Sequence, residues 1–186
     1  TDTTSNSLDF VIGAYNGANN FSGRMDDIRY FDRTVTQAEI THLATSRGIE
    51  GPPPVGLGGE TMWICPSLDQ SSTTKELTGA GLTITEAKSG AATIAIAADT
   101  GEGGTHALEF VKDTSYSELV IDNFGNTPAE VSSVAFWVRT ELVGGNDMRL
   151  MGLNTNFWPT AGSGRFFYQV WTGPARGYMY DPSGGT

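Results

Sequence analysis

The sequence predicts an all-β sandwich with one short helix. Short runs of apolar or alternating residues recur along the chain, and segments rich in Gly, Asn, Asp and Pro separate them. Only 17% of the 186 residues are charged, whereas 24 are glycine. Many short strands joined by tight turns are typical of β-sandwiches and jelly rolls.

Two strands are expected near the start of the chain, at residues 8–13 and 23–31. In the second, Ile28 and Tyr30 alternate with polar or exposed-type neighbours. This alternation is typical of a strand with one face on the core and the other in solvent. The sequence therefore predicts a half-buried strand at residues 23–31.

The one expected helix follows this second strand. Thr36 and Glu39 form a capping box, in which each side chain accepts a hydrogen bond from the backbone N–H of the other residue. Ile40, Leu43 and Ala44 then supply the apolar stripe of a short helix.

A proline-rich linker, residues 51–59, divides the chain into residues 1–50 and 60–186. Three consecutive prolines cannot form a central strand, because proline has no N–H for the sheet ladder. Fifty residues rarely hold a core of their own, so we expect the first segment to dock on other strands. The second segment contains strand patterns only, at residues 61–64, 82–87, 91–98, 107–111, 117–121, 131–140, 149–153, 166–171 and 177–180.

The charge of the chain makes some classes of partner improbable. The formal net charge is −10, from 11 basic and 21 acidic residues. No Lys/Arg cluster is present to bind phosphates, so no nucleic-acid partner is expected. No apolar run approaches the roughly 20 residues of a membrane span. Cys65 is the only cysteine, and its apolar neighbours predict a buried thiol; the alternative is a disulfide to another chain.

Residues 21–33, with the sequence FSGRMDDIRYFDR, and the TQAEI helix start that follows resemble a recurring ending. They are similar to the C-terminal signature of the laminin-G-like, or concanavalin-A-like, jelly-roll superfamily. Thr34 and Val35 depart from the Ala-Leu that is common in the family. Three shorter stretches after the linker, residues 62–69, 106–110 and 134–139, resemble the opening strands of the same fold.

The resemblance implies an unusual order of parts. The C-terminal part of a laminin-G-like sandwich (residues 1–50) precedes the linker, and the N-terminal part (residues 60–186) follows it. Either the chain is one period of a tandem array, completed by a neighbour, or it is a permuted domain that completes itself. Strand donation between neighbours with head-to-tail geometry would grow a filament.

The resemblance also implies a candidate metal site. In related jelly rolls an aspartate of this signature can help to hold a structural calcium ion near the opening strand. Carried over, Asp26 is a possible calcium ligand that Asp69 could approach. The alternative is that an aspartate of the signature bonds to a turn or pairs with Arg29 or Arg33.

Three aromatic residues are candidates for a ligand or an interface: Trp158, Trp171 and Tyr178. Exposed aromatic rings stack on sugars, and they also anchor subunit contacts. Ordinary packing is the third reading.

No arrangement of side chains suggests catalysis, because the two histidines lack a base-and-orienter setting and the carboxylates are scattered. We therefore expect a non-catalytic extracellular structural or adhesion module, on a cell or virion surface, with copies of itself as partners. The alternative is a glycan-binding, lectin-like module that uses calcium and cell-surface glycans.

Overall fold

The computed structural model describes residues 10–13, 21–45, 56–99, 105–111, 116–122, 133–140, 148–153, 167–170 and 177–179. The strands are β1 (Phe10–Ile12), β2 (Gly23–Phe31), β3 (Met62–Ile64), β4 (Thr83–Lys88), β5 (Thr93–Ala98), β6 (His106–Val111), β7 (Ser117–Asp122), β8 (Ser133–Thr140), β9 (Met148–Leu153), β10 (Phe167–Val170) and β11 (Gly177–Met179). One helix, α1 (Gln37–Thr45), lies within these ranges. The prediction of a mainly β chain with one short helix is confirmed.

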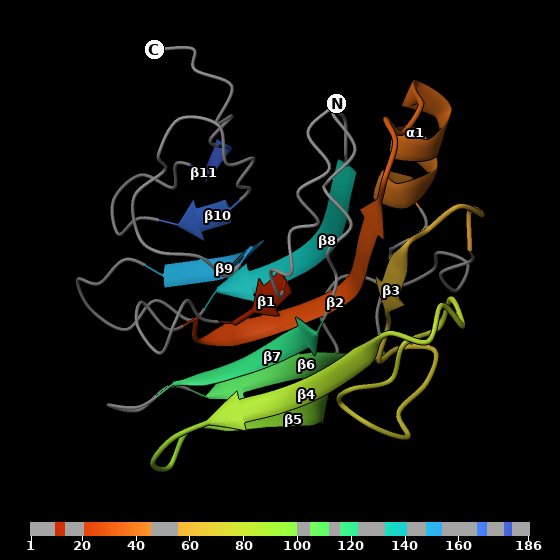
Figure 1. Ribbon diagram of the computed structural model, residues 1–186. Coiled ribbons are helices and arrows are strands. Elements are labelled where there is room, and N and C mark those ends of the chain that lie inside the picture. Colours follow the sequence, from red (N-terminus) through yellow and green to blue (C-terminus); the bar gives the residue numbers. More distant parts are fainter. Residues whose placement is uncertain are drawn as a thin grey trace, which may run out of the picture.

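The strands form two antiparallel sheets (Figure 1). Among the described residues, the six-stranded sheet has the order β11-β10-β9-β1-β7-β4. The five-stranded sheet has the order β3-β2-β6-β5, and β8 pairs with the other side of β2. Each strand expected after the linker is present within a few residues of its predicted bounds.

One hydrophobic core joins the two sheets. β1 contributes Phe10 and Ile12 to it, and β2 contributes Met25, Ile28 and Tyr30. The rings of Phe10 and Tyr30 meet edge to face across the sheets, with centroids 6.0 Å apart. Burying a side chain of this size stabilises the fold by about 1.5–3 kcal/mol, so strands from the first segment supply a large part of the core.

β1 and β2 are interior strands, although they come first in the sequence. β1 lies between β7 and β9, and its centre, Val11, is opposite Val120 on one side and Gly152 on the other. β2 pairs with β8 along its length, and its other edge pairs with β6 at residues 23–25 and with β3 at residues 28–30. Every one of these partners follows the proline-rich linker in the sequence. The first segment therefore docks in the middle of both sheets.

The expectation that β2 is half-buried is wrong. All of its residues except Arg24 are buried, including Arg29 and Phe31 on the face away from the core. That outer face is covered because Glu60 contacts Arg29 and because the Arg33 guanidinium lies 5.2 Å from the centre of the Phe31 ring. An alternating pattern shows which residues face the core, but not what covers the opposite face.

Two backbone positions fix the path of these strands. Asp27 has a φ of 51°, in the left-handed region, where the pairing of β2 with β8 shifts register. Gly13, just after β1, has a φ of 98°. A Cβ atom there would lie 2.3 Å from a ring carbon of Phe110, so only glycine fits. No helix within the described ranges has the length and apolar character that a membrane crossing requires.

Candidate functional site

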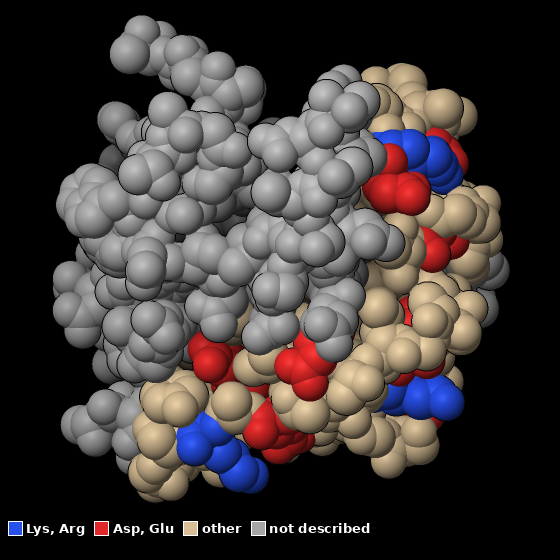
Figure 2. Space-filling view, in the orientation of Figure 1, with Lys and Arg blue, Asp and Glu red and all other residues tan. Residues whose placement is uncertain are grey.

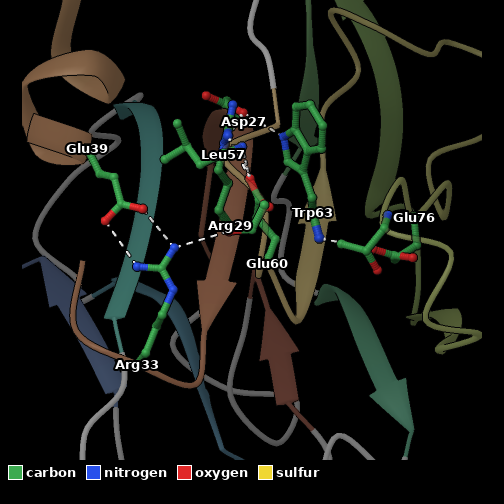
Figure 3. A network of polar contacts seen from close by, with 10 residues as sticks. Asp27, Arg29, Arg33, Glu39, Leu57, Glu60, Trp63 and Glu76 are labelled. Carbon is green, nitrogen blue, oxygen red and sulfur yellow. Dashed lines mark hydrogen bonds and ion pairs between the residues drawn. The ribbon is translucent and has the colours of Figure 1, made fainter. Parts of the chain in front are cut away.

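The most extensive polar network described lies on the outer face of β2 (Figure 3). The Asp27 carboxylate accepts hydrogen bonds from Arg29 Nε at 2.8 Å and from Trp63 Nε1 at 2.7 Å. Arg29 Nη1 donates to Glu60 Oε1 at 3.0 Å, and the same oxygen accepts from the backbone N–H of Leu57 at 2.7 Å. These bonds connect β2 to β3 and to residues 57–60, which precede β3.

This network is buried. The side chains of Asp27, Arg29 and Glu60 are 2%, 1% and 6% exposed. The Arg29 guanidinium also lies 4.3 Å from the centre of the Trp63 ring, which gives a cation–π contact. Removing one member of a buried ion pair costs about 3–5 kcal/mol, because the partner charge stays buried without compensation. The correct partners are therefore strongly preferred over any mispaired arrangement.

A second ion-pair group lies at the start of β2. Arg24 donates from Nη2 and Nε to Glu109 Oε1 at 2.6 and 2.9 Å, and from Nη1 to the carbonyl of Ala98 at 2.9 Å. Arg139, opposite Arg24 on β8, donates to Asp99 at 3.1 Å. Four strands, β8, β2, β6 and β5, thus meet in one partly exposed charge network.

A third group lies where β2 leads into α1. Arg33 donates to both oxygens of Glu39, at 3.0 and 2.8 Å, and to the carbonyl of Gly58 at 3.1 Å. The capping box is confirmed: the Thr36 N–H donates to Glu39 at 2.7 Å and the Glu39 N–H to the Thr36 hydroxyl at 3.2 Å. The hydrogen bond from Arg33, and then those from Thr36, lower the pKa of Glu39 from 4.5 to about 2. The bond with Glu39 raises the pKa of Arg33.

The first two groups join the segment before the linker to the segment after it. The third joins the segment before the linker to Gly58 of the linker itself. We call the side chains of Arg24, Asp26, Asp27, Arg29 and Arg33, together with their partners, the β2 clasp. The Val35 N–H adds a bond to the Ser133 hydroxyl at 3.2 Å. The signature that suggested the fold is, in the structure, the seam between the two segments.

Asp26, the first predicted calcium ligand, belongs to this seam. Its side chain is held by protein donors: Oδ1 accepts from the Asp27 N–H at 2.7 Å, and Oδ2 accepts from the Ser67 hydroxyl at 2.5 Å. The Ser67 hydroxyl oxygen also lies 2.8 Å from the carbonyl oxygen of His106, and it accepts a hydrogen bond from the His106 N–H at 3.3 Å. Asp26 thus connects β2 to the turn after β3 and to β6. The alternative prediction was that an aspartate of the signature pairs with Arg29. Asp27, the residue after Asp26, forms this pair.

Asp69, the second predicted calcium ligand, is engaged locally. Its carboxylate accepts from the Ser71 N–H at 2.9 Å and lies 4.0 Å from the Lys75 ammonium. The bonds with Ser71, ahead of the charge of Lys75, lower the pKa of Asp69. Calcium in proteins takes about 6–8 oxygen ligands, and no group of three or more His, Cys, Asp or Glu gathers among the described residues. The residues described do not form a calcium cage, and a bound ion stays a prediction.

The predicted aromatic sites fall largely outside the part of the chain that the structure describes. Trp158 and Trp171 lie outside the described residues. Tyr178 lies in β11, where its backbone is opposite Gln169 of β10. A role in sugar or subunit contact therefore stays a prediction for all three.

Sequence reasoning missed Glu60 and Trp63, which hold the centre of the clasp. Trp63 was expected in a strand, but nothing in its local pattern indicates Asp27 as a partner 36 positions away. Cys65 is buried, as predicted. Figure 2 shows acidic and basic side chains interspersed on the described part of one face, in line with ion pairs that tie elements together.

No protein-family model, no curated protein and no solved structure matches the chain. The fold assignment that the structure supports is a mainly antiparallel β architecture in two sheets with one short helix.

Proposed function

We propose that the chain is a non-catalytic structural module of the laminin-G-like, jelly-roll kind that works by strand complementation. Residues 10–45 act as a donor segment, which carries β1, β2 and α1. The strands after the linker act as the acceptor. Exchange of donor segments between neighbouring copies then assembles the modules head to tail. One observation supports this most directly: β1 and β2 are each paired on both sides with strands of the acceptor.

The interior position of the donor strands gives complementation its driving force. Without β1, the strands β7 and β9 have no partner between them, and without β2 the strands β3, β6 and β8 lose their shared neighbour. Each gap exposes apolar core side chains to water and leaves backbone N–H and C=O groups of the flanking strands free to pair with another strand. An acceptor is therefore stable only when a donor segment occupies both gaps, whichever copy provides it.

The β2 clasp gives complementation its selectivity. Apolar core contacts are permissive, since many sequences of similar shape could fill the gap. Buried charges are not permissive, because a donor with any other register would leave Arg29, Asp27 or Glu60 without its partner. The clasp therefore favours copies of this chain as partners over unrelated strands.

A role on the outside of a cell or virion fits the same features. Head-to-tail repeats suit surface fibres and adhesion stalks, and a formal net charge of −10 suits a protein that does not bind nucleic acid. We place the module in that setting, with cell-surface glycans as a further class of partner. Calcium and the aromatic residues named above belong to that second, lectin-like reading.

A cysteine pair across β1 and β7 tests whether β1 comes from the same chain as β7 or from a neighbouring copy. The Gly13 N–H donates to the carbonyl of Leu150 on β9, so alternate residues of β1 bond to β9. Val11 and Val120 then form a non-hydrogen-bonded pair, the closer of the two antiparallel geometries. In a Cys65→Ala background, we expect oxidised Val11→Cys/Val120→Cys protein to give disulfide-linked dimers and higher species on non-reducing gels.

The matched control is Ala98→Cys/His106→Cys, a pair that lies directly opposite on β5 and β6 of the acceptor. Its disulfide forms within one chain under either mode of assembly. If the β1–β7 pair also gave only intrachain disulfides at every protein concentration, exchange between copies would be ruled out.

A further inference from the structure

Two edge strands lie on one side of the sandwich. β4 ends the six-stranded sheet and β5 ends the five-stranded sheet, and no described strand lies beyond either. Residues 89–92 join the two strands, so both edges lie together at the bottom of the view in Figure 1. An edge strand directs the N–H and C=O groups of every second residue away from its neighbour. This side of the molecule is therefore able to pair with further strands.

β5 has few of the features that usually protect an edge, apart from the Arg24 guanidinium that bonds to the carbonyl of its last residue, Ala98. Its sequence, Thr-Ile-Ala-Ile-Ala-Ala, contains no charge and no proline. Thr93 and Ala95 are exposed, while Ile94 is buried in the core. Natural sheets commonly place lysine, proline or a bulge on such an edge to prevent association. An uncharged, regular six-residue edge is a site for strand addition.

Each edge is complementary to the same edge of a second copy. An antiparallel copy of β5 centred on Ala95 places Ile94 opposite Ile96 of the second copy, with matching faces. On β4, Glu86 and Lys88 lie two residues apart on one face, with 3.7 Å between their charged groups. An antiparallel copy centred on Ala87 places each Glu86 opposite the Lys88 of the other copy. Like charges do not meet at either edge.

One symmetry axis can serve both edges. Ala87 and Ala95 lie at similar distances from the turn that joins β4 to β5, on opposite sides of it. A two-fold axis that lies between the two copies and crosses both sheets would relate β4 to its copy about Ala87 and β5 to its copy about Ala95. A two-fold contact buries the same patch on both partners, and it closes after two copies.

We propose that a second copy of this chain docks on the β5 edge, so that both sheets continue from one copy into the next. The pairing strands β4 and β5 both belong to the acceptor, so this contact does not depend on strand exchange, although Arg24 of the donor segment bonds to the Ala98 carbonyl at the end of β5. It is a lateral contact, distinct from the head-to-tail one.

A lysine on the β5 edge tests the contact. In the symmetric register, Ala95→Lys places two lysines directly opposite each other, which opposes pairing. Like charges placed opposite each other across an interface cost several kcal/mol, so we expect the dissociation constant of the lateral dimer, from sedimentation velocity of the full chain, to rise at least about ten-fold. Ala38→Lys is the matched control: it adds the same charge to an exposed residue of α1, away from β4 and β5 (Figure 1), and it should leave the constant unchanged.

Cross-linking gives an independent readout. In a Cys65→Ala background, Ala95→Cys should form a disulfide-linked dimer on oxidation, and Ala91→Cys should form far less. A wild-type chain that stays monomeric over a wide concentration range would overturn the proposal. An assembly that Ala95→Lys leaves intact would also overturn it. If Val11→Cys/Val120→Cys still formed disulfides between chains in that assembly, the strand-exchange proposal would be supported and only the lateral contact would be rejected.

Discussion

The two faces of β2 hold the donor segment in different ways. The inner face presents Met25, Ile28 and Tyr30 to the core, where contacts depend on shape and volume. The outer face presents Arg24 and Arg29 to acidic partners, where contacts depend on charge and geometry. The comparison teaches that the inner contacts tolerate side chains of similar size, whereas the outer contacts require one set of charged partners in one register.

The largest expected effect comes from the outer face. Arg29→Ala leaves the Asp27 and Glu60 carboxylates buried near each other, which we expect to cost about 3–5 kcal/mol in the free energy of unfolding. Urea denaturation measures this loss. The double variant Arg29→Ala/Glu60→Ala should recover part of it, with a coupling energy of about 0.5–3 kcal/mol. Additive losses would mean that the two charges do not act as a pair.

On the inner face, Ile28→Ala removes buried methyl and methylene groups and leaves a cavity. We expect a loss of about 2–5 kcal/mol in the same assay. No partial recovery should follow when Glu60→Ala is added, because Ile28 makes no polar contact with the clasp. Coupling between these two changes would show that the faces are not independent, and the comparison would fail.

The smallest expected effect is the pH dependence of the Arg33–Glu39 group. The pKa of Glu39 is lowered from 4.5 to about 2 in the folded chain. Its contribution is therefore fully present above pH 4.5 and is lost as the pH falls toward 2. Glu39→Gln should flatten the fall of the urea midpoint in that window, whereas Asp32→Asn, at an exposed neighbour, should not. Equal slopes in wild type and Glu39→Gln would contradict this assignment.

Much of the fold could be read from the sequence because its signals are local. The strands after the linker were set by apolar runs between turns, and the capping box of Thr36 and Glu39 by a spacing of three residues. The burial of Cys65 followed from its apolar neighbours. Each of these features depends on residues that are close in the chain.

The centre of the clasp could not be read in the same way. Glu60 reaches Arg29 across 31 positions and Glu109 reaches Arg24 across 85, and no local pattern specifies such pairs. The same limit explains the error about the outer face of β2. Alternation places Arg29 away from the core, but only the folded chain brings Glu60 and Trp63 over it.

The interior position of β1 and β2 has a consequence for how the protein is made. A ribosome releases the chain from its N-terminal side, so both strands emerge before every strand with which they pair. Contacts over long sequence separations, such as that of Val35 with Ser133 across 98 positions, also form slowly. During translation the donor strands therefore wait, exposed, for an acceptor that is still being synthesised. On a polysome, the first complete acceptor that a waiting strand meets can belong to the chain ahead of it.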